Sequence, residues 1–300
     1  MTKQKVTKAV IAAAGFGTRF LPQTKAMPKE MLPLIDKPII QYIVEDLVKA
    51  GIQDIIIVGS SNKRSIEDHF DLPNEDLLAN LRAGGPKKQP FIDETESVAE
   101  LANFVYIRQK GPYGNATPIM NAAHLLGNEP FIYAFADDLT VHDPNMYEQM
   151  IACYNEFGGS VMPCIKAVVD KDYDRYGIVE GKLIRDDIMA MTGVIEKPGK
   201  VAAPSNFATV GGYLLTPEVF AYLDAGLQNL EGGKEFYVTD SLIDPMIKDG
   251  KKVYGQLIRG KRYDTGDPLE YLKTVVDFAL RDDDLAEPLR EHLIARLREK

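Results

Sequence analysis

The sequence has few of the residues that build disulfides, zinc sites or nucleophilic triads. Cysteine occurs only twice in 300 residues, as Cys153 and Cys164, and both lie in apolar segments. A disulfide framework or a cysteine zinc site needs spacing and partners that are missing, so two buried thiols are expected. The four histidines show no ligand spacing and no obvious serine or cysteine partner. Zinc chemistry and triad catalysis are therefore poor interpretations.

Long apolar runs and long basic runs are also absent. No stretch approaches a membrane-spanning length, and the opening MTKQKVTK has charge without the apolar core of a secretion signal. We therefore predict a cytoplasmic protein. The net charge is −9 and the basic residues are scattered, so a nucleic-acid surface is not expected. A ligand such as a nucleotide would have to be bound by local, specific cations.

The spacing of apolar residues predicts an α/β fold. Strand-like runs alternate with segments of helical spacing through the first half of the chain, and such βαβ units form parallel sheets. We predict a Rossmann-like, doubly wound, mostly parallel mixed sheet flanked by helices, which longer β-like runs extend after about residue 160. The strand-like runs of the first half are 10–14, 55–60, 104–107 and 131–135, and the helix-like segments are 38–50 and 118–126.

A glycine-containing loop follows the first predicted strand. Gly15 and Gly17 let the backbone turn sharply and expose its N–H groups, which favours an anion ligand. Arg19 and Lys29 supply cations nearby. The loop lacks the third glycine of a dinucleotide fingerprint, since Phe20 stands there, and it lacks the Gly-Lys-Ser/Thr of a Walker loop. By itself it is compatible with a phosphate site or with an ordinary turn.

The longer string GFGTRFLPQTKAMPKEMLPLIDKPIIQY, at 15–42, resembles the opening signature of the sugar-nucleotide pyrophosphorylases. It is most similar to that of the bacterial UTP–glucose-1-phosphate uridylyltransferases, as is SIEDHFD at 65–71. The resemblance implies a nucleotidyltransferase fold in which Arg19 and Lys29 contact the triphosphate as catalytic residues. It implies nucleotide contacts from Ala13, Ala14, Gly15, Gly17 and Thr18.

Two aspartates far apart in the sequence are the predicted metal ligands. Asp137 and Asp138 follow the strand-like run FIYAF, and Asp264 lies in GKRYDTGDPLEYL, which resembles the late Asp-x-Gly motif of the family. The resemblance implies that Asp137 and Asp264 hold one Mg²⁺, a cation that prefers one or two carboxylates plus phosphate oxygens. The alternative is that these aspartates only form turns.

Further segments of the family pattern predict where the sugar and the base would lie. The resemblance assigns Glu196 and Lys197 of an EKP motif to the sugar and its phosphate, with Lys197 also catalytic. It adds the sugar contacts Tyr176, Gly177, Thr209 and Tyr213, and the base contacts Gln109 and Gly114.

The loop after Gly114 departs from this pattern. The chain has Asn115-Ala116-Thr117-Pro118 where the family usually continues Leu-Gly-His-Ala. The departure bears on the choice of base and leaves the predicted phosphate and metal residues unchanged.

The resemblance implies a Mg²⁺-assisted transfer of uridylyl from UTP to glucose-1-phosphate, giving UDP-glucose and pyrophosphate. The predicted domain spans 1–266, with a nucleotide-binding part to about residue 160 and a sugar-binding part after it. Helices at 267–300, separated near 282–288, would pack on this domain or on a second chain, and the family suggests a homodimer or homotetramer. The alternatives are a transferase using dTTP or another nucleotide, a non-catalytic nucleotide-sugar sensor, or a structural α/β protein.

Overall fold

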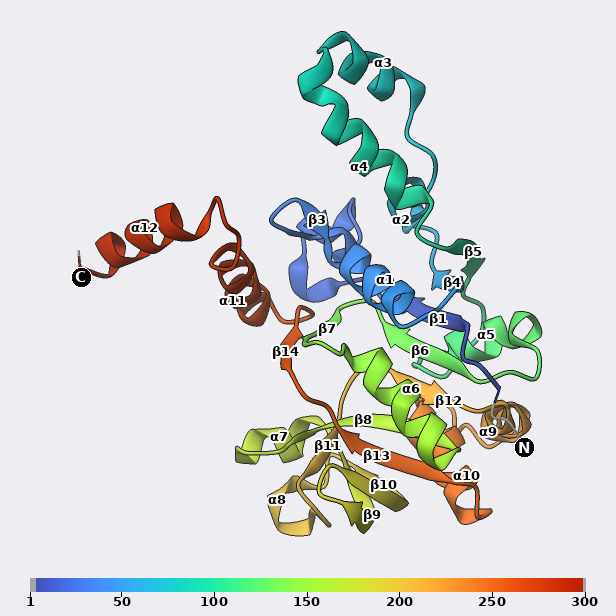
Figure 1. The fold of residues 1–300 in the computed structure, drawn as a ribbon. Coiled ribbons are helices and arrows are strands. Elements are labelled where there is room, and N and C mark those ends of the chain that lie inside the picture. The colour runs from blue at the N-terminus through green and yellow to red at the C-terminus, as the bar shows by residue number, and fades with distance from the viewer. Residues whose placement is uncertain (1–3, 299–300) are drawn as a thin grey trace.

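The apolar runs form the strands of a ten-stranded mixed sheet in the computed structural model, which describes residues 4–298 (Figure 1). The strand order is β11-β9-β10-β13-β8-β12-β6-β1-β4-β5. Strands β6, β1, β4 and β5 are mutually parallel, β13 is parallel to β8, and β12 runs antiparallel between β8 and β6. The bounds are β1 Lys8–Ala13, β4 Asp54–Gly59, β5 Asn103–Arg108, β6 Phe131–Phe135, β8 Ser160–Lys166, β9 Gly177–Arg185, β10 Ile188–Glu196, β11 Phe207–Thr209, β12 Tyr213–Leu215 and β13 Val253–Leu257. The predicted α/β fold with a large mixed sheet is confirmed, with its parallel pairs at β6-β1-β4-β5 and at β13-β8 and antiparallel pairs elsewhere.

Helices cover both faces of this sheet, and two small two-stranded sheets lie outside it. The helices are α1 Ile39–Lys49, α2 Arg64–His69, α3 Glu75–Ala83, α4 Gln89–Ala99, α5 Thr117–Leu126, α6 Met146–Phe157, α7 Asp170–Arg175, α8 Gly199–Ala202, α9 Leu223–Gln228, α10 Asp244–Lys248, α11 Pro268–Ala279 and α12 Ala286–Arg298. The small sheets pair β2 Pro33–Leu34 with β3 Lys37–Pro38, and β7 Asp138–Val141 with β14 Lys261–Asp264. Among residues 4–298 no helix has the length and apolar character to cross a membrane.

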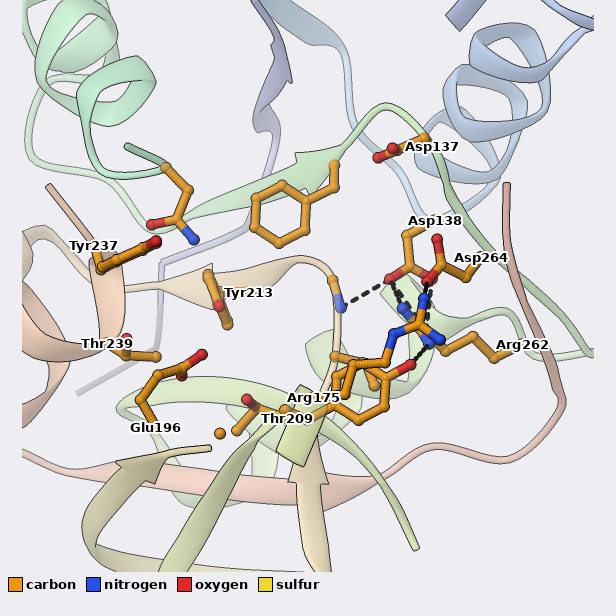
Figure 2. Close-up of a pocket in the computed structure, with 16 residues that line it drawn as sticks. Asp137, Asp138, Arg175, Glu196, Thr209, Tyr213, Tyr237, Thr239, Arg262 and Asp264 are labelled. Atoms are coloured by element: carbon orange, nitrogen blue, oxygen red, sulfur yellow. Dashed lines mark hydrogen bonds and ion pairs between the residues drawn. The ribbon is translucent and has the colours of Figure 1, made fainter. Parts of the chain in front are cut away.

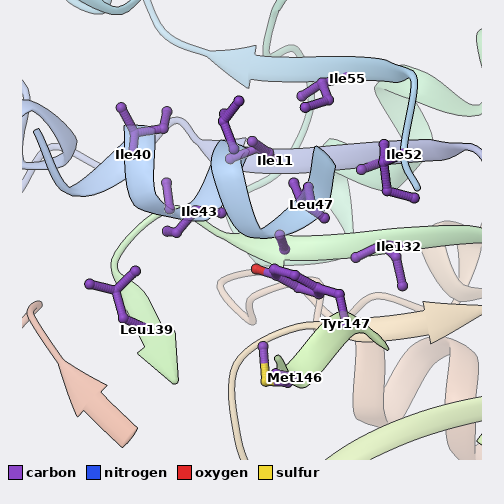
Figure 3. Close-up of a cluster of buried hydrophobic side chains, with 14 of the residues drawn as sticks. Ile11, Ile40, Ile43, Leu47, Ile52, Ile55, Ile132, Leu139, Met146 and Tyr147 are labelled. Atoms are coloured by element: carbon purple, nitrogen blue, oxygen red, sulfur yellow. The ribbon is translucent and has the colours of Figure 1, made fainter. Parts of the chain in front are cut away.

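The alternation of side chains along the strands produces two cores, one on each face of the sheet. Ile11 and Ile55 face α1 and α6, where they pack with Ile43, Leu47 and other buried residues (Figure 3). The intervening Val10 and its neighbours in β4 and β6 face α5, α9 and α10. Each fully buried isoleucine or leucine contributes about 1.5–3 kcal/mol relative to an exposed one, so these layers hold the strand ends in place.

The sheet continues across the predicted boundary near residue 160, because β8 lies between β13 and β12. The division into a nucleotide-binding part and a sugar-binding part stays a prediction. Cys153 and Cys164 are both buried, and neither forms a disulfide in the described part of the chain.

The two C-terminal helices behave differently. Helix α11 packs on its own domain, where Phe278 contacts Tyr42 and Tyr263 edge-on. Helix α12 extends away from the sheet and has no buried side chain among its described residues (Figure 1). The predicted break between the two helices, 282–288, extends too far, because α12 already begins at Ala286. Pro288 lies in the first turn of α12, where a residue without an N–H loses no helical hydrogen bond.

Asn145 connects α1 to α6 on one face of the sheet. It caps α6 through Glu148 N, which donates to its Oδ1 at 3.0 Å. Its Nδ2 donates to the backbone oxygen and to Oδ1 of Asp46 in α1, at 2.9 and 3.3 Å. Burial raises the pKa of the half-buried Asp46 carboxyl to about 6, although the bond from Asn145 opposes the shift.

We expect the variant Asp46→Asn to be more stable than the wild type at neutral pH but not at pH 4. The pKa of Asp46 is higher in the folded chain than in the unfolded one, so the free energy of unfolding falls as pH rises from about 4 to 6. Asparagine keeps an acceptor for Asn145 without the buried charge. Because the group is only half-buried, we expect a gain of about 1 kcal/mol at pH 7, measured by urea unfolding across pH 4–8. An equal difference at pH 4 and pH 7 would contradict this.

Candidate active site

Two hollows meet beyond the carboxyl ends of the parallel strands. The order β5-β4-β1-β6 changes direction at β1, and α/β sheets bind ligands at such a switch point. The first hollow is lined by the loops that follow β1, β4, β5 and β6, and the second by β9, β10, β12 and the segment after β6. Four residues line both hollows, Asn115, Phe135, Asp137 and Tyr237, so the two form one continuous cleft.

The first hollow contains most of the predicted nucleotide residues. Its lining includes Ala14, Gly15, Gln109, Gly114 and Lys29. The side chain of Ala13 is instead buried in the core, and Ala12 lines the hollow, because successive residues of β1 point to opposite faces. Contact from Ala13 to a ligand would therefore have to come from its backbone.

The loop after Gly15 turns back through the left-handed conformation of Gly17, whose φ is 63°. A Cβ at this position would lie 3.1 Å from side-chain carbons of both Lys29 and Thr24, so glycine also permits close packing. Thr18 and Arg19 begin a short 3₁₀ helix and do not line the hollow itself. Arg19 Nη1 reaches across to the backbone oxygen of Gly266 at 3.2 Å.

The predicted phosphate and metal residues are close together. Lys29 Nζ forms an ion pair with Asp137 Oδ2, and Arg175 Nη2 pairs with Asp264 Oδ2 at 2.5 Å. Burial alone would lower the pKa of Lys29, but the carboxylates of Asp137 and Glu30 together outweigh it, so that this pKa is raised. A Cβ on Gly266 would lie 2.7 Å from Asp137 Oδ2 and 3.3 Å from Asp264 Oδ1. The two carboxylates therefore flank one small space that glycine leaves open.

Asp138, the neighbour of Asp137, is a structural anchor. Its carboxylate is buried and receives Arg262 Nη2 at 2.6 Å and Nε at 2.8 Å, as well as the backbone N–H of Gly211 at 3.0 Å (Figure 2). Arg262 also donates to the hydroxyl of Tyr176 at 2.9 Å. This network fixes the side of the second hollow that Asp137 and Asp264, the two metal-ligand candidates, also line.

The second hollow brings together the predicted sugar residues (Figure 2). Gly177 lies opposite Glu196 in the β9–β10 pair, and a Cβ there would approach Glu196 Oε2 to 2.9 Å and Thr209 Oγ1 to 3.1 Å. Burial raises the pKa of the Glu196 carboxyl, while Lys197 opposes the shift. Tyr213 is buried against Phe135 beside this pair. Carboxylate, hydroxyl and aromatic groups suit a ligand with several hydroxyls.

Lys197 lies at the rim and does not line the second hollow. Its side chain is 54% exposed, and its Nζ is 3.7 Å from Glu196 Oε1. The backbone φ of 48° is unusual for a residue with a side chain and turns the chain sharply after β10.

The unusual loop after Gly114 connects the two hollows. Asn115 Oδ1 accepts the N–H of Val238 at 2.8 Å, and the buried Tyr133 hydroxyl donates to the Asn115 backbone oxygen at 2.5 Å. Phe236 N donates to Tyr113 O at 2.7 Å. The departure from the family pattern thus provides a side chain that fixes one loop of the cleft to another.

Reasoning from the sequence missed Arg175, Arg262, Tyr237, Glu30 and Lys63. Three of them stand beside residues that were predicted: Glu30 follows Lys29, Arg175 precedes Tyr176, and Arg262 is two residues before Asp264 on the same strand. That proximity was a usable signal. For Lys63 the sequence offers none, since only the fold brings it to the glycine loop.

The fold and the cleft are those of a nucleotidyltransferase, and residues 8–279 match the family model for nucleotidyl transferases. The chain is 41% identical to a UTP–glucose-1-phosphate uridylyltransferase of Staphylococcus epidermidis over 287 residues, which are 96% of this chain and 97% of that protein. A UTP-bound UDP-glucose pyrophosphorylase from Acinetobacter baumannii superposes with a TM-score of 0.87 at 33% identity, covering 97% and 99% of the two chains. Another, solved with UDP-glucose, has a TM-score of 0.78 at 34% identity, covering 93% and 100%.

The chain therefore belongs to the nucleotidyl transferase family and, within it, to the UTP–glucose-1-phosphate uridylyltransferases.

Proposed function

We propose that the chain transfers the uridylyl group of UTP to glucose-1-phosphate, giving UDP-glucose and pyrophosphate. The observation that carries the proposal is the continuous cleft, in which a glycine loop with Lys29 lies on one side and the Glu196 pocket on the other. Asp137 lines both parts, at the place where a sugar phosphate and a nucleotide would meet. The relatives at 41% and 33% identity bear the same activity in their names.

The chemistry needs no enzyme nucleophile. An oxygen of glucose-1-phosphate forms a bond to the α-phosphorus of UTP, and the bond from that phosphorus to the bridging oxygen of pyrophosphate breaks. Catalysis of phosphoryl-type transfer depends on positioning and on neutralising negative charge as it develops. In this proposal Arg19 and Lys29 bind the triphosphate, and Glu196 with Thr209 orients the sugar. Lys197, at the rim beside Glu196, would bind the sugar phosphate.

Asp137 and Asp264 are the proposed ligands of Mg²⁺. They present carboxylate oxygens to the same space beside Gly266, and Mg²⁺ favours such oxygens together with phosphate and water. When bound, the ion would neutralise phosphate charge and act as a Lewis acid. The ion pairs with Lys29 and Arg175 hold both carboxylates in place.

The direct test is release of pyrophosphate from UTP and glucose-1-phosphate in the presence of Mg²⁺. We expect turnover that stops when the metal is chelated and returns when Mg²⁺ is added. Rates with dTTP and with other sugar phosphates distinguish the proposed reaction from that of a transferase using another nucleotide or another sugar. Binding of UDP-glucose without turnover of any combination of nucleotide and sugar phosphate would support the sensor alternative. Absence of UTP binding in calorimetry would contradict both the transferase and the sensor hypotheses.

The association state is part of the proposal. Leu285, Ile294 and Leu297 on or beside α12 are 42%, 44% and 75% exposed, and we propose that they bind a second copy in a homodimer or homotetramer. Light scattering of the purified chain tests this, and a monomer at micromolar concentration would exclude it. The cytoplasmic location expected from the sequence stays a prediction.

A further inference from the structure

A buried ion pair lies beneath the glycine loop. Lys63 follows β4 in the chain, and its Nζ is 2.8 Å from Glu30 Oε2 and 2.6 Å from the backbone oxygen of Gly15. The side chains are 3% and 0% exposed. Glu30 directly follows Lys29, so the pair is one residue from a predicted catalytic group.

The pair fixes the direction of a peptide group in the loop. A trans peptide is planar, so the N–H of a residue points away from the carbonyl of the residue before it. When Lys63 holds the Gly15 carbonyl inward, the N–H of Phe16 is directed to the opposite side. Both Gly15 and Phe16 line the first hollow. The carbonyl of Gly17 is held in a similar way, because the Thr24 hydroxyl donates to its oxygen at 2.7 Å.

The unbonded N–H groups of the loop support this orientation. Within residues 4–298 the N–H groups of Gly15, Phe16 and Gly17 donate to no protein acceptor. Backbone N–H groups presented together form an anion site, whereas an outward carbonyl oxygen would repel phosphate. Lys63 thus removes a repulsive dipole from the hollow.

Stability does not explain why the pair is ionic. Desolvating two charges is costly, and apolar residues of similar size are often as stable or more so. Glu30 Oε1 is buried without a hydrogen-bond partner in the described structure, which adds to the cost. A pair of opposite charges has no net charge, however, and this suits a position beside Lys29 and a phosphate site. Lys63 alone would repel Lys29, and Glu30 alone would draw Lys29 away from phosphate.

We propose that Lys63 and Glu30 are positioning residues for the triphosphate: they hold the Gly15 peptide so that the loop presents N–H groups to UTP. The inference rests on the proposed function, because UTP is its ligand. It assigns the pair to nucleotide binding and not to the sugar pocket, from which it is separated by the glycine loop and Asp137.

The test is the double variant Glu30→Met, Lys63→Met, which replaces both charges with apolar groups of similar length. We expect a melting temperature near that of the wild type, a KM for UTP raised about 10-fold or more, and a KM for glucose-1-phosphate within about 2-fold. A merely structural role would change both KM values together. The matched control is Lys8→Met, since Lys8 also contacts a backbone oxygen and a glutamate, Leu125 O and Glu129, but at the opposite end of β1.

Lys63→Arg covers the case in which the double variant does not fold. Arginine keeps the charge and can donate to both Gly15 O and Glu30, so we expect it to retain most of the UTP affinity measured by calorimetry. A folded double variant with an unchanged KM for UTP would overturn the inference. So would a Lys63→Arg variant whose affinities for glucose-1-phosphate and for UTP both fall by the same factor relative to the wild type. An inactive wild type is a failure of the proposed function, while an active wild type with an equally active double variant is a failure of this inference alone.

Discussion

Replacing Asp137 with asparagine will lower turnover by about 100-fold or more while the chain remains folded. The carboxylate is the ion-pair partner of Lys29 and one of two that flank Gly266. Asparagine has the same size but no charge, so it cannot neutralise Lys29 or serve as a strong ligand for Mg²⁺. Loss of a preorganised electrostatic group at such a centre typically costs 10²–10³ in kcat, of order 100-fold here.

The fold should survive because the backbone of Asp137, and not its carboxylate, makes the structural bonds. Its carbonyl accepts Thr265 N at 3.0 Å and Thr265 Oγ1 at 2.7 Å. Initial rates at saturating UTP, glucose-1-phosphate and Mg²⁺ measure the loss of turnover, and thermal unfolding measures the stability of the variant. Asp143→Asn is the matched control, since Asp143 also pairs with a lysine, Lys49 at 2.7 Å, but on the exposed surface. Turnover in Asp137→Asn within about 3-fold of that control would refute the role.

Local patterns predicted the elements that carry the site, because each depends on residues near one another in the chain. The run before Gly15 forms β1, helical spacing gives α1, and FIYAF forms β6 with Asp137 just beyond its end. Since parallel strands end at the same edge of a sheet, a loop after β1 and an aspartate after β6 had to be close. The two neighbouring strands are paired in the structure as this argument requires.

What the sequence did not disclose depends on contacts between distant segments. Asp264 was expected at the site from the family resemblance, but not the way it reaches the site: β14 pairs with β7 outside the main sheet and places Asp264 opposite Asp138. Periodicity says nothing about such a pairing between two four-residue strands. The bonds from Lys63 to Glu30 and from Arg262 to Asp138 span 33 and 124 residues, so no spacing in the sequence marks them. The Lys197 backbone is a local exception, because its φ of 48° is a conformation that residue type and spacing do not indicate.

Gly114→Ala will damage both hollows at once. The backbone of Gly114 has a φ of 133°, and a Cβ there would lie 2.6 Å from the carbonyl carbon of Phe236 and closer still to its nitrogen and oxygen. These are backbone atoms, so no side chain can rotate to relieve the clash. The loops must separate, which strains the bonds from Phe236 N to Tyr113 O and from Ala116 N to Phe236 O, at 2.7 and 2.9 Å.

The expected result is a loss of stability of about 1–3 kcal/mol together with a fall of about 100-fold in kcat/KM, because a shift of about 1 Å at reacting groups can have that effect. Gly127→Ala is the matched control: Gly127 also has a positive φ, 64°, but a Cβ there meets nothing within 4 Å. Both variants place a side chain at positive φ, so the additional loss in Gly114→Ala reports the clash together with the more extreme φ of Gly114. Equal stability and equal kcat/KM for Gly114→Ala and Gly127→Ala would contradict this prediction. Such a result would mean that the loops of Gly114 and Phe236 can move apart without affecting the cleft.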